Sequence, residues 1–184
     1  MIPVLRSRRL TIRPFTLGDA PRVAELINNW NVVSMLTRVP YPYTLTHARG
    51  WIDAHPQMAE EGDLPRAIEF EGELVGATGY HLMKDETGER GWEIGYWLGQ
   101  PYWGRGLASE TAQLLVKHAF EDWRLPRLIS GHFADNPASG RVLTKAGFRY
   151  VGEEQRFSTA REEEVRCFLL EQTLSDYLLT EDAA

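Results

Sequence analysis

The sequence predicts one α+β domain with a mostly antiparallel mixed sheet flanked by helices. Short strand-like segments separated by tight turns follow one another from residue 66 to residue 98, as in an antiparallel meander. The last of them leads into a glycine-rich loop and then into an amphipathic helix. The 184 residues, 43% apolar and 25% charged, contain no repeat and no low-complexity linker. We therefore expect residues 1–184 to form a single domain.

The N-terminal segment predicts a strand followed by a helix. Arg9–Phe15 alternates apolar and polar residues, which is typical of a half-buried strand. Asp19 is the candidate N-cap of a helix that runs to about Asn28, with Pro21 in its first turn. Residues 29–44 are irregular and rich in aromatic side chains, which either line a ligand pocket or cover an edge of the core. We take the pocket as the working hypothesis.

The next segment predicts a second helix and a β-hairpin. Thr46 is the candidate cap of a helix that continues to Met58, and Pro56 is expected to kink or shorten it. Arg66–Phe70 and Leu74–Tyr80 then flank a short turn that contains a glycine. These two strands begin the meander.

The remaining elements alternate between strand and helix. Residues 85–91 predict a polar turn before the aromatic strand Trp92–Leu98. The other expected elements are the helix Leu107–Phe120, the strand Leu128–Phe133, a helix from Asn136 to about Lys145 that ends at Gly147, the strands Phe148–Val151 and Val165–Leu170 around a charged turn, and a short helix from Leu174.

The loop at residues 100–110 has the features of an anion site. A strand, a glycine turn and a helix start present free backbone N–H groups at the positive end of a helix dipole. Gly104 and Gly106 lack a Cβ, so a phosphate can approach the main chain, and Arg105 adds charge. The loop lacks the GxxxxGK string of a Walker loop, and Ser109 replaces the third glycine of a dinucleotide fingerprint. Taken alone, the loop is either an anion site or a simple connection.

Composition excludes several classes of protein. The formal net charge of −6 argues against broad binding to nucleic acid and is compatible with a cationic amine substrate. No apolar run is long enough to span a bilayer and no signal-peptide pattern is present, which predicts a cytoplasmic protein without a membrane partner. Cys167, the single cysteine, lies in an apolar run where a buried inert thiol is expected. The five histidines are scattered, so no metal site is predicted.

Four motifs in order resemble those of the GNAT N-acetyltransferases. They are Glu93-Ile94-Gly95-Tyr96, Trp103-Gly104-Arg105-Gly106-Leu107-Ala108-Ser109-Glu110, Asn136-xx-Ser139 and Lys145-Ala146-Gly147-Phe148. Within that superfamily, these motifs and the opening Arg9–Phe15 resemble the RimJ/RimL type of ribosomal-protein N-terminal acetyltransferase. The superfamily usually begins the loop with Gln or Arg, and Trp103 in that position points to the RimJ/RimL-like branch.

The resemblance implies a GNAT-type domain with a splayed central strand, acetyl-CoA as the acyl donor and a primary amine as the acceptor. Backbone N–H groups of the loop would hold the pyrophosphate, the end of the central strand would pair with the pantetheine arm, and Asn136 would bind the pantetheine or nucleotide portion. The implied cofactor-binding residues are Leu98, Gly99, Gln100, Trp103, Gly104, Arg105, Gly106, Leu107, Ala108, Ser109 and Asn136.

The chemistry of acyl transfer then suggests roles for individual residues. An amine attacks a thioester only when it is neutral, and Glu93 is the candidate base, directly or through water. A backbone N–H near Tyr96 and Trp97, freed by a bulge at Gly95, would face the developing oxyanion. Ser139 is the candidate proton donor to the departing thiolate, with Tyr150 as an alternative. Glu93 is otherwise a structural carboxylate of the sheet face, and Ser139 otherwise a helix-capping hydroxyl.

The acceptor side of the site is less defined by sequence. Trp30, Tyr43 and His81 are the candidate substrate-binding residues, and the acceptor is either a protein N-terminus or a small amine. Aromatic residues such as Trp30, Trp51 and Tyr43 would favour a homodimer if they were exposed. A non-catalytic acyl-CoA-binding module of the same fold is the alternative to an enzyme.

Overall fold

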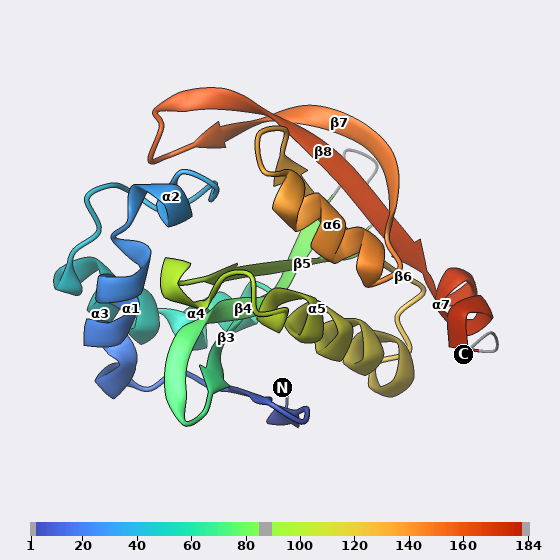
Figure 1. The fold of residues 1–184 in the computed structure, drawn as a ribbon, viewed down its shortest axis with the longest axis horizontal. Coiled ribbons are helices and arrows are strands. Elements are labelled where there is room, and N and C mark those ends of the chain that lie inside the picture. Colours follow the sequence, from blue (N-terminus) through green and yellow to red (C-terminus); the bar gives the residue numbers. More distant parts are fainter. Residues whose placement is uncertain (1–2, 85–89, 182–184) are drawn as a thin grey trace.

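The computed structural model describes residues 3–84 and 90–181, and these form a layered α+β domain around one twisted sheet (Figure 1). The described strands are β1 (Leu5–Arg6), β2 (Leu10–Arg13), β3 (Asp63–Phe70), β4 (Glu73–Lys84), β5 (Arg90–Leu98), β6 (Arg127–Phe133), β7 (Arg149–Ser158) and β8 (Glu163–Thr173). They lie in the order β1-β2-β3-β4-β5-β6-β8-β7. Every neighbouring pair is antiparallel except β5 and β6, which confirms the predicted mixed sheet.

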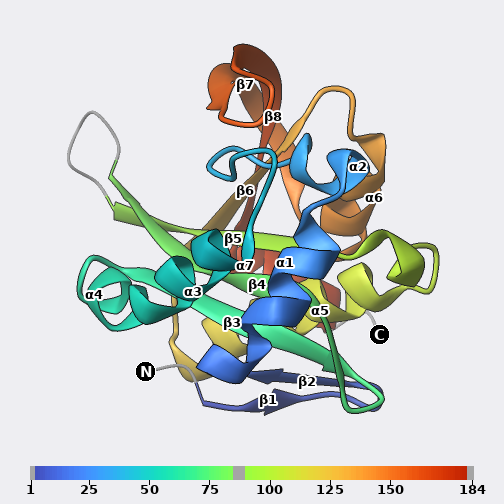
Figure 2. The same ribbon diagram turned by 90° about the vertical axis from the view of Figure 1, so that its left-hand side faces the viewer.

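Helices cover both faces of the sheet (Figure 2). The helices are α1 (Ala20–Ile27), α2 (Trp30–Val33), α3 (Leu45–Asp53), α4 (His55–Glu60), α5 (Leu107–Lys117), α6 (Pro137–Lys145) and α7 (Leu174–Glu181), with a π-helical turn at His118–Asp122 after α5. One core cluster joins Val23 and Ile52 to Trp97 on the first face. Another joins Leu115 and Leu143 to Ile94 on the second face. Within residues 3–84 and 90–181, no helix is long and apolar enough to cross a membrane.

Several predicted elements are longer than sequence patterns suggested. The β3–β4 hairpin continues to Lys84, and β7 continues to Ser158, because cross-strand pairing carries both past their apolar segments. The predicted turn at residues 85–91 lies largely outside the described residues, since only Arg90 and Gly91 are described, both in β5. The short strand β1 was not predicted and pairs with β2 through Leu5 and Ile12.

Of two predicted helix caps, one is replaced by another residue and the other is in place without a capping hydrogen bond. Thr44, not Thr46, caps α3, because its Oγ1 accepts from His47 N at 3.3 Å while His47 Nδ1 accepts from Thr44 N at 3.2 Å. Asp19 stands at the N-cap of α1 without a capping hydrogen bond. Its carboxylate instead accepts two hydrogen bonds from Arg13, each 2.8 Å long. Pro56 lies in the first turn of the separate helix α4, which begins at His55, so the predicted interruption is confirmed.

The sheet divides between β5 and β6. The two strands pair only at Trp92 with Leu128 and at Glu93 with Ile129, and beyond that point they diverge. Ser130 Oγ on β6 still donates to Ile94 O at 2.9 Å. The splayed central strand is therefore confirmed. The bulge predicted at Gly95 is wrong, because β4 and β5 pair without a register shift along this stretch; divergence of β6 alone opens the edge of β5.

Candidate active site

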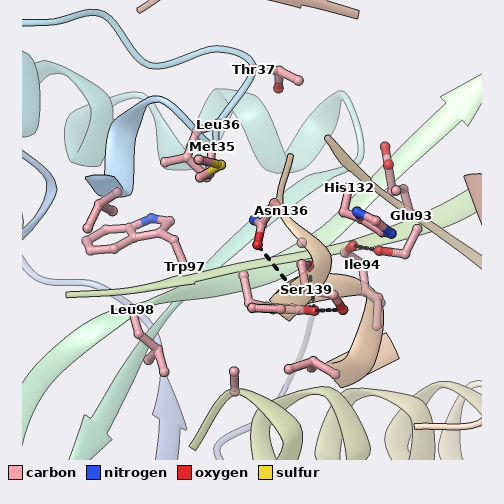
Figure 3. A pocket seen from close by; sticks show the side chains of 18 of the residues that line it. Met35, Leu36, Thr37, Glu93, Ile94, Trp97, Leu98, His132, Asn136 and Ser139 are labelled. Carbon is pink, nitrogen blue, oxygen red and sulfur yellow. Dashed lines mark hydrogen bonds between the residues drawn. The ribbon is translucent and has the colours of Figure 1, made fainter. Parts of the chain in front are cut away.

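A cleft of about 850 Å³ lies where β5 and β6 separate (Figure 3). Its walls come from β5, the loop before α5, the N-terminal end of α6 and strand β7. Glu93 and His132 lie at one end, Trp97 and Leu98 lie at the other, and Ser139 lies between them (Figure 3). Side chains alternate along β5, so Glu93 and Trp97 project to the face covered by α1 and α3.

The open edge of β5 presents backbone polar groups to this cleft. Ser130 on β6 donates to Ile94 O, and the Trp103 indole Nε1 donates to Leu98 O at 2.8 Å. Both carbonyls therefore point toward the side that β6 has left. A strand residue directs its N–H and C=O to the same side, and alternate residues share that side. Tyr96, midway between Ile94 and Leu98, therefore directs its N–H into the gap.

The glycine loop has the backbone shape of an anion cradle. Gly104 and Gly106 have φ of +74° and +76°, a region that side chains with a Cβ disfavour. Gly106 is the N-cap of α5, so the first N–H groups of that helix face the loop. Arg9 fixes the loop from outside, since its Nη1 donates to Arg105 O at 3.0 Å and its Nη2 lies 2.6 Å from Glu110 Oε2.

Three of the predicted cofactor-binding residues do not line the cleft. The Arg105 guanidinium lies over the ring of Phe70, 4.9 Å from its centroid, so it does not add charge to the loop. Gly99 is packed against Leu26, where an added Cβ would come within 2.6 Å of Cδ2. Gln100 Oε1 accepts from Asn29 Nδ2 at 2.8 Å. The cleft is lined by the other predicted positions, Leu98, Trp103, Gly104, Gly106, Leu107, Ala108, Ser109 and Asn136.

Ser139 lies in the first turn of α6 beside Tyr96. The two hydroxyl oxygens are 2.9 Å apart, and either can donate. Asn136 is the N-cap of α6, because its Oδ1 accepts from Ser139 N at 3.2 Å. The Ser139 hydroxyl is therefore not the cap. Burial raises the pKa of Tyr96 to about 12, so its phenol stays protonated at neutral pH.

Glu93 is held in an ion pair. Its Oε1 accepts from Arg156 Nη1 at 2.7 Å, and the two side chains are 15% and 20% exposed. Arg156 also donates to Glu154, so the three groups together keep one net negative charge. The two carboxylates raise the pKa of Arg156 against the opposing effect of burial, which keeps the guanidinium charged. An ammonium at this end of the cleft meets a negative site.

Sequence reasoning missed the pairing of His132 with Tyr150. His132 Nδ1 lies 2.8 Å from Phe133 O, which fixes the proton on Nδ1. In the neutral imidazole, Nε2 then accepts from the Tyr150 hydroxyl at 3.0 Å. Gly140 leaves room for this contact, since an added Cβ would lie 2.5 Å from the Tyr150 oxygen. His132 lies on β6 and Tyr150 lies on β7, so their contact depends on how the two strands are arranged in the fold. No local sequence pattern predicts it.

The three predicted substrate-binding residues lie in different places. His81 lines the cleft, with Nδ1 3.4 Å from Asp63 Oδ2. Tyr43 is 7% exposed and lines a second cavity beside the cleft. Trp30 is 47% exposed, packs edge-on against Tyr41 and lines neither cavity, so the structure separates it from the site. The described residues contain no cluster of His, Cys, Asp and Glu side chains arranged to hold a metal ion.

Comparison with known proteins identifies the family. A family model described as an acetyltransferase (GNAT) domain matches residues 9–149. The uncharacterized N-acetyltransferase p20 of Bacillus licheniformis is 28% identical over 160 residues, which are 85% of this chain and 88% of that protein. The ribosomal-protein-serine acetyltransferase of Escherichia coli is 33% identical over 82 residues, which are 45% of each chain.

Solved structures agree with these relatives. The ribosomal L7/L12 alpha-N-protein acetyltransferase RimL, solved in complex with coenzyme A, superposes with a TM-score of 0.77 at 19% identity, over 94% of this chain and 97% of that one. At that identity the likeness shows a shared fold. The chain belongs to the GNAT acetyltransferase family. Its relatives include proteins named as ribosomal acetyltransferases, which supports a place in the RimJ/RimL-like branch.

Proposed function

We propose that the protein is an acetyl-CoA-dependent N-acetyltransferase that acts on a primary amine. The observation that carries the proposal is the open edge of β5, where the Tyr96 N–H faces a cleft that is also lined by Ser139, whose hydroxyl lies 2.9 Å from the Tyr96 phenol oxygen. A thioester placed there would have its carbonyl oxygen near a fixed N–H donor and its sulfur near a hydroxyl. Membership in an acetyltransferase family and the coenzyme A complex of the RimL structure support the choice of donor.

The residues that are present fit coenzyme A. Open space lies around the Cα of Gly104, where an added Cβ would meet no heavy atom within 4 Å, and the start of α5 supplies N–H donors for the pyrophosphate. Leu98 and Tyr96 offer a strand edge to the amide groups of pantetheine. Acetyl-CoA supplies an activated acetyl group when it is bound.

The protein would supply the acid–base groups for transfer to the amine. We propose that Glu93 accepts the proton of the acceptor ammonium, directly or through water, while Arg156 fixes the carboxylate. The amine nitrogen then bonds to the acetyl carbon, the carbon–sulfur bond breaks, and the nitrogen releases its excess proton to water. Ser139 gives its hydroxyl proton to the thiolate and regains a proton from water, directly or through the Tyr96 phenol to which it is hydrogen-bonded. The products are an amide and free coenzyme A.

A thiol-release assay tests the proposal. Acetyl-CoA is offered with N-terminal peptides and small amines, beside calorimetric titration of coenzyme A. Turnover that falls in Glu93→Gln and Ser139→Ala supports the transferase. Coenzyme A binding without turnover on any acceptor favours the alternative, an acyl-CoA-binding module of the same fold. Absence of coenzyme A binding refutes both.

The class of acceptor, the cellular location and the oligomeric state are also proposals. The ribosomal-protein-serine acetyltransferase of Escherichia coli supports a protein N-terminus, and a small amine is the second candidate. We also propose a cytoplasmic location, tested by cell fractionation, and a homodimer, tested by sedimentation. The aromatic surface expected at a dimer interface is smaller than predicted, because Tyr43 is buried and Trp51 packs edge-on against Phe15.

A further inference from the structure

A second cavity, of about 460 Å³, adjoins the cleft on the face of the sheet covered by α1 and α3. The two cavities share the lining residues Leu36, Thr37, Arg38, His81, Gly95, Tyr96 and Trp97. Gly95 is one of these shared residues, and a Cβ built on it would meet no heavy atom within 4 Å. The strand surface is therefore bare at the place where a molecule would pass from the reacting centre into the second cavity.

The walls of the second cavity are apolar and aromatic. Tyr43, Trp51 and Trp97 contribute rings, and Ile27 and Met58 contribute aliphatic surface. Burial raises the pKa of Tyr43 to about 12, so this ring is neutral at physiological pH. Aromatic walls favour an aromatic guest, because rings gain from edge-to-face contacts in addition to buried area.

The charges on the cavity wall are already paired. Asp63 Oδ2 lies 2.9 Å from Arg38 Nη1 and 3.4 Å from His81 Nδ1. A guest with a second ammonium, such as a polyamine, would have to compete with Arg38 for the Asp63 carboxylate. A guest without a side chain, or with a very small one, would leave the cavity unfilled. Neither would present a ring to the aromatic walls.

We propose that the second cavity is the acceptor-side pocket and that it takes an aromatic ring joined by a short chain to the reacting primary amine. This inference rests on the proposed N-acetyltransferase function. The amine would lie at the junction beside Gly95, between the acetyl site and the cavity, with Glu93 on the same face of β5. The volume falls within the range of small-molecule pockets, which are roughly 300–1,000 Å³.

The test compares three amines in the thiol-release assay: 2-phenylethylamine, alaninamide and spermidine. The inference predicts that kcat/KM for 2-phenylethylamine exceeds that for either of the others by at least about tenfold, as burial of a ring in an apolar pocket allows. Equal values for 2-phenylethylamine and alaninamide, or a preference for spermidine, would overturn it.

A pair of variants on α4 assigns the preference to the cavity. Met58→Trp places a larger side chain on the cavity wall, whereas Gln57→Trp adds the same side chain at a neighbouring exposed position that lines neither cavity. Met58→Trp should lower kcat/KM for 2-phenylethylamine by about tenfold and leave alaninamide and coenzyme A binding unchanged. Gln57→Trp should change none of these. An equal loss for both amines in Met58→Trp would overturn the assignment.

A binding measurement distinguishes failure of the proposed transferase function from failure of the pocket assignment. If no amine in the panel is acetylated, the transferase proposal fails, and the cavity is then tested by equilibrium titration of 2-phenylethylamine followed by tryptophan fluorescence. Saturable binding that Met58→Trp weakens and Gln57→Trp does not would still support an aryl-amine pocket. Absence of binding would overturn it.

Discussion

Arg156 on β7 donates a hydrogen bond of 2.7 Å from Nη1 to Glu93 Oε1 on β5, and the pair joins the two sides of the cleft. The strands that carry these residues are not neighbours in the sheet, since β6 and β8 lie between them. The pair therefore depends on the curvature of the whole sheet. It also fixes the carboxylate that we propose as the base.

Removal of Arg156 should destabilise the fold more than removal of an exposed arginine. Arg156→Ala leaves the partly buried carboxylate of Glu93 and the exposed carboxylate of Glu154 without this cation, at a cost of about 1–3 kcal/mol in the free energy of unfolding. Arg166→Ala is the control, because the side chains of Arg166 and Glu153 are 55% and 53% exposed. This variant should lose less than about 1 kcal/mol in the free energy of unfolding. Urea unfolding measures both, and equal losses would contradict the prediction.

The Ser139 hydroxyl should act in turnover and not in binding. Ser139→Ala should lower kcat by about 10²-fold, as expected for loss of a general acid, with coenzyme A affinity unchanged. The α6 cap should remain, because Asn136 bonds the backbone N–H of residue 139. Stopped-flow or steady-state kinetics beside calorimetry separates the two effects. An unchanged kcat in this variant, with a large loss in Tyr96→Phe, would assign the proton to the phenol instead.

Substitution of Gly104 should weaken coenzyme A binding by filling space in the cleft, in addition to straining the backbone. Gly104→Ala and Gly72→Ala carry the same backbone strain, of about 1 kcal/mol, because both residues have positive φ (+74° and +81°) and open space at the Cβ position. Only Gly104 lines the cleft, so only Gly104→Ala should weaken coenzyme A binding, by roughly tenfold or more. Similar affinities in the two variants would exclude this loop as the pyrophosphate site.

His55 should make stability fall in mild acid. Burial lowers its pKa from 6.5 to about 4, and its Nε2 is buried without a hydrogen-bond partner among the described residues. The unfolded chain therefore binds a proton that the folded chain does not, and stability decreases as pH falls from about 6.5 toward 4. His55→Phe keeps a ring beside Trp51 and removes this titration.

Urea unfolding at pH 7.5, 6.0 and 5.0 checks the prediction. The wild-type protein should lose about 1–2 kcal/mol more than His55→Phe across this range, after allowance for partial exposure of the imidazole. Taking the difference between the two proteins removes contributions from other groups, such as His118, whose pKa is also lowered by burial. Parallel pH profiles would show that His55 stays solvated.

Local patterns in the sequence determined the elements and the general type of site. Alternation predicted the strand at Arg9–Phe15, and aromatic and β-branched residues predicted the strand Trp92–Leu98. Helical periodicity predicted α5, and glycines at 104 and 106 marked the loop where φ is positive. These features depend on neighbours within a few residues, so the sequence displays them. The order of the motifs also led to the correct family.

Tertiary structure decided which side chains meet. Arg156 reaches Glu93, His132 reaches Tyr150 and the Arg105 guanidinium turns away onto Phe70, and each contact joins residues from separate elements. The freed N–H of Tyr96 likewise follows from the divergence of β6 and not from a local bulge. Contacts of this kind depend on strand order, register and twist, which are properties of the assembled sheet, so no short segment of sequence records them.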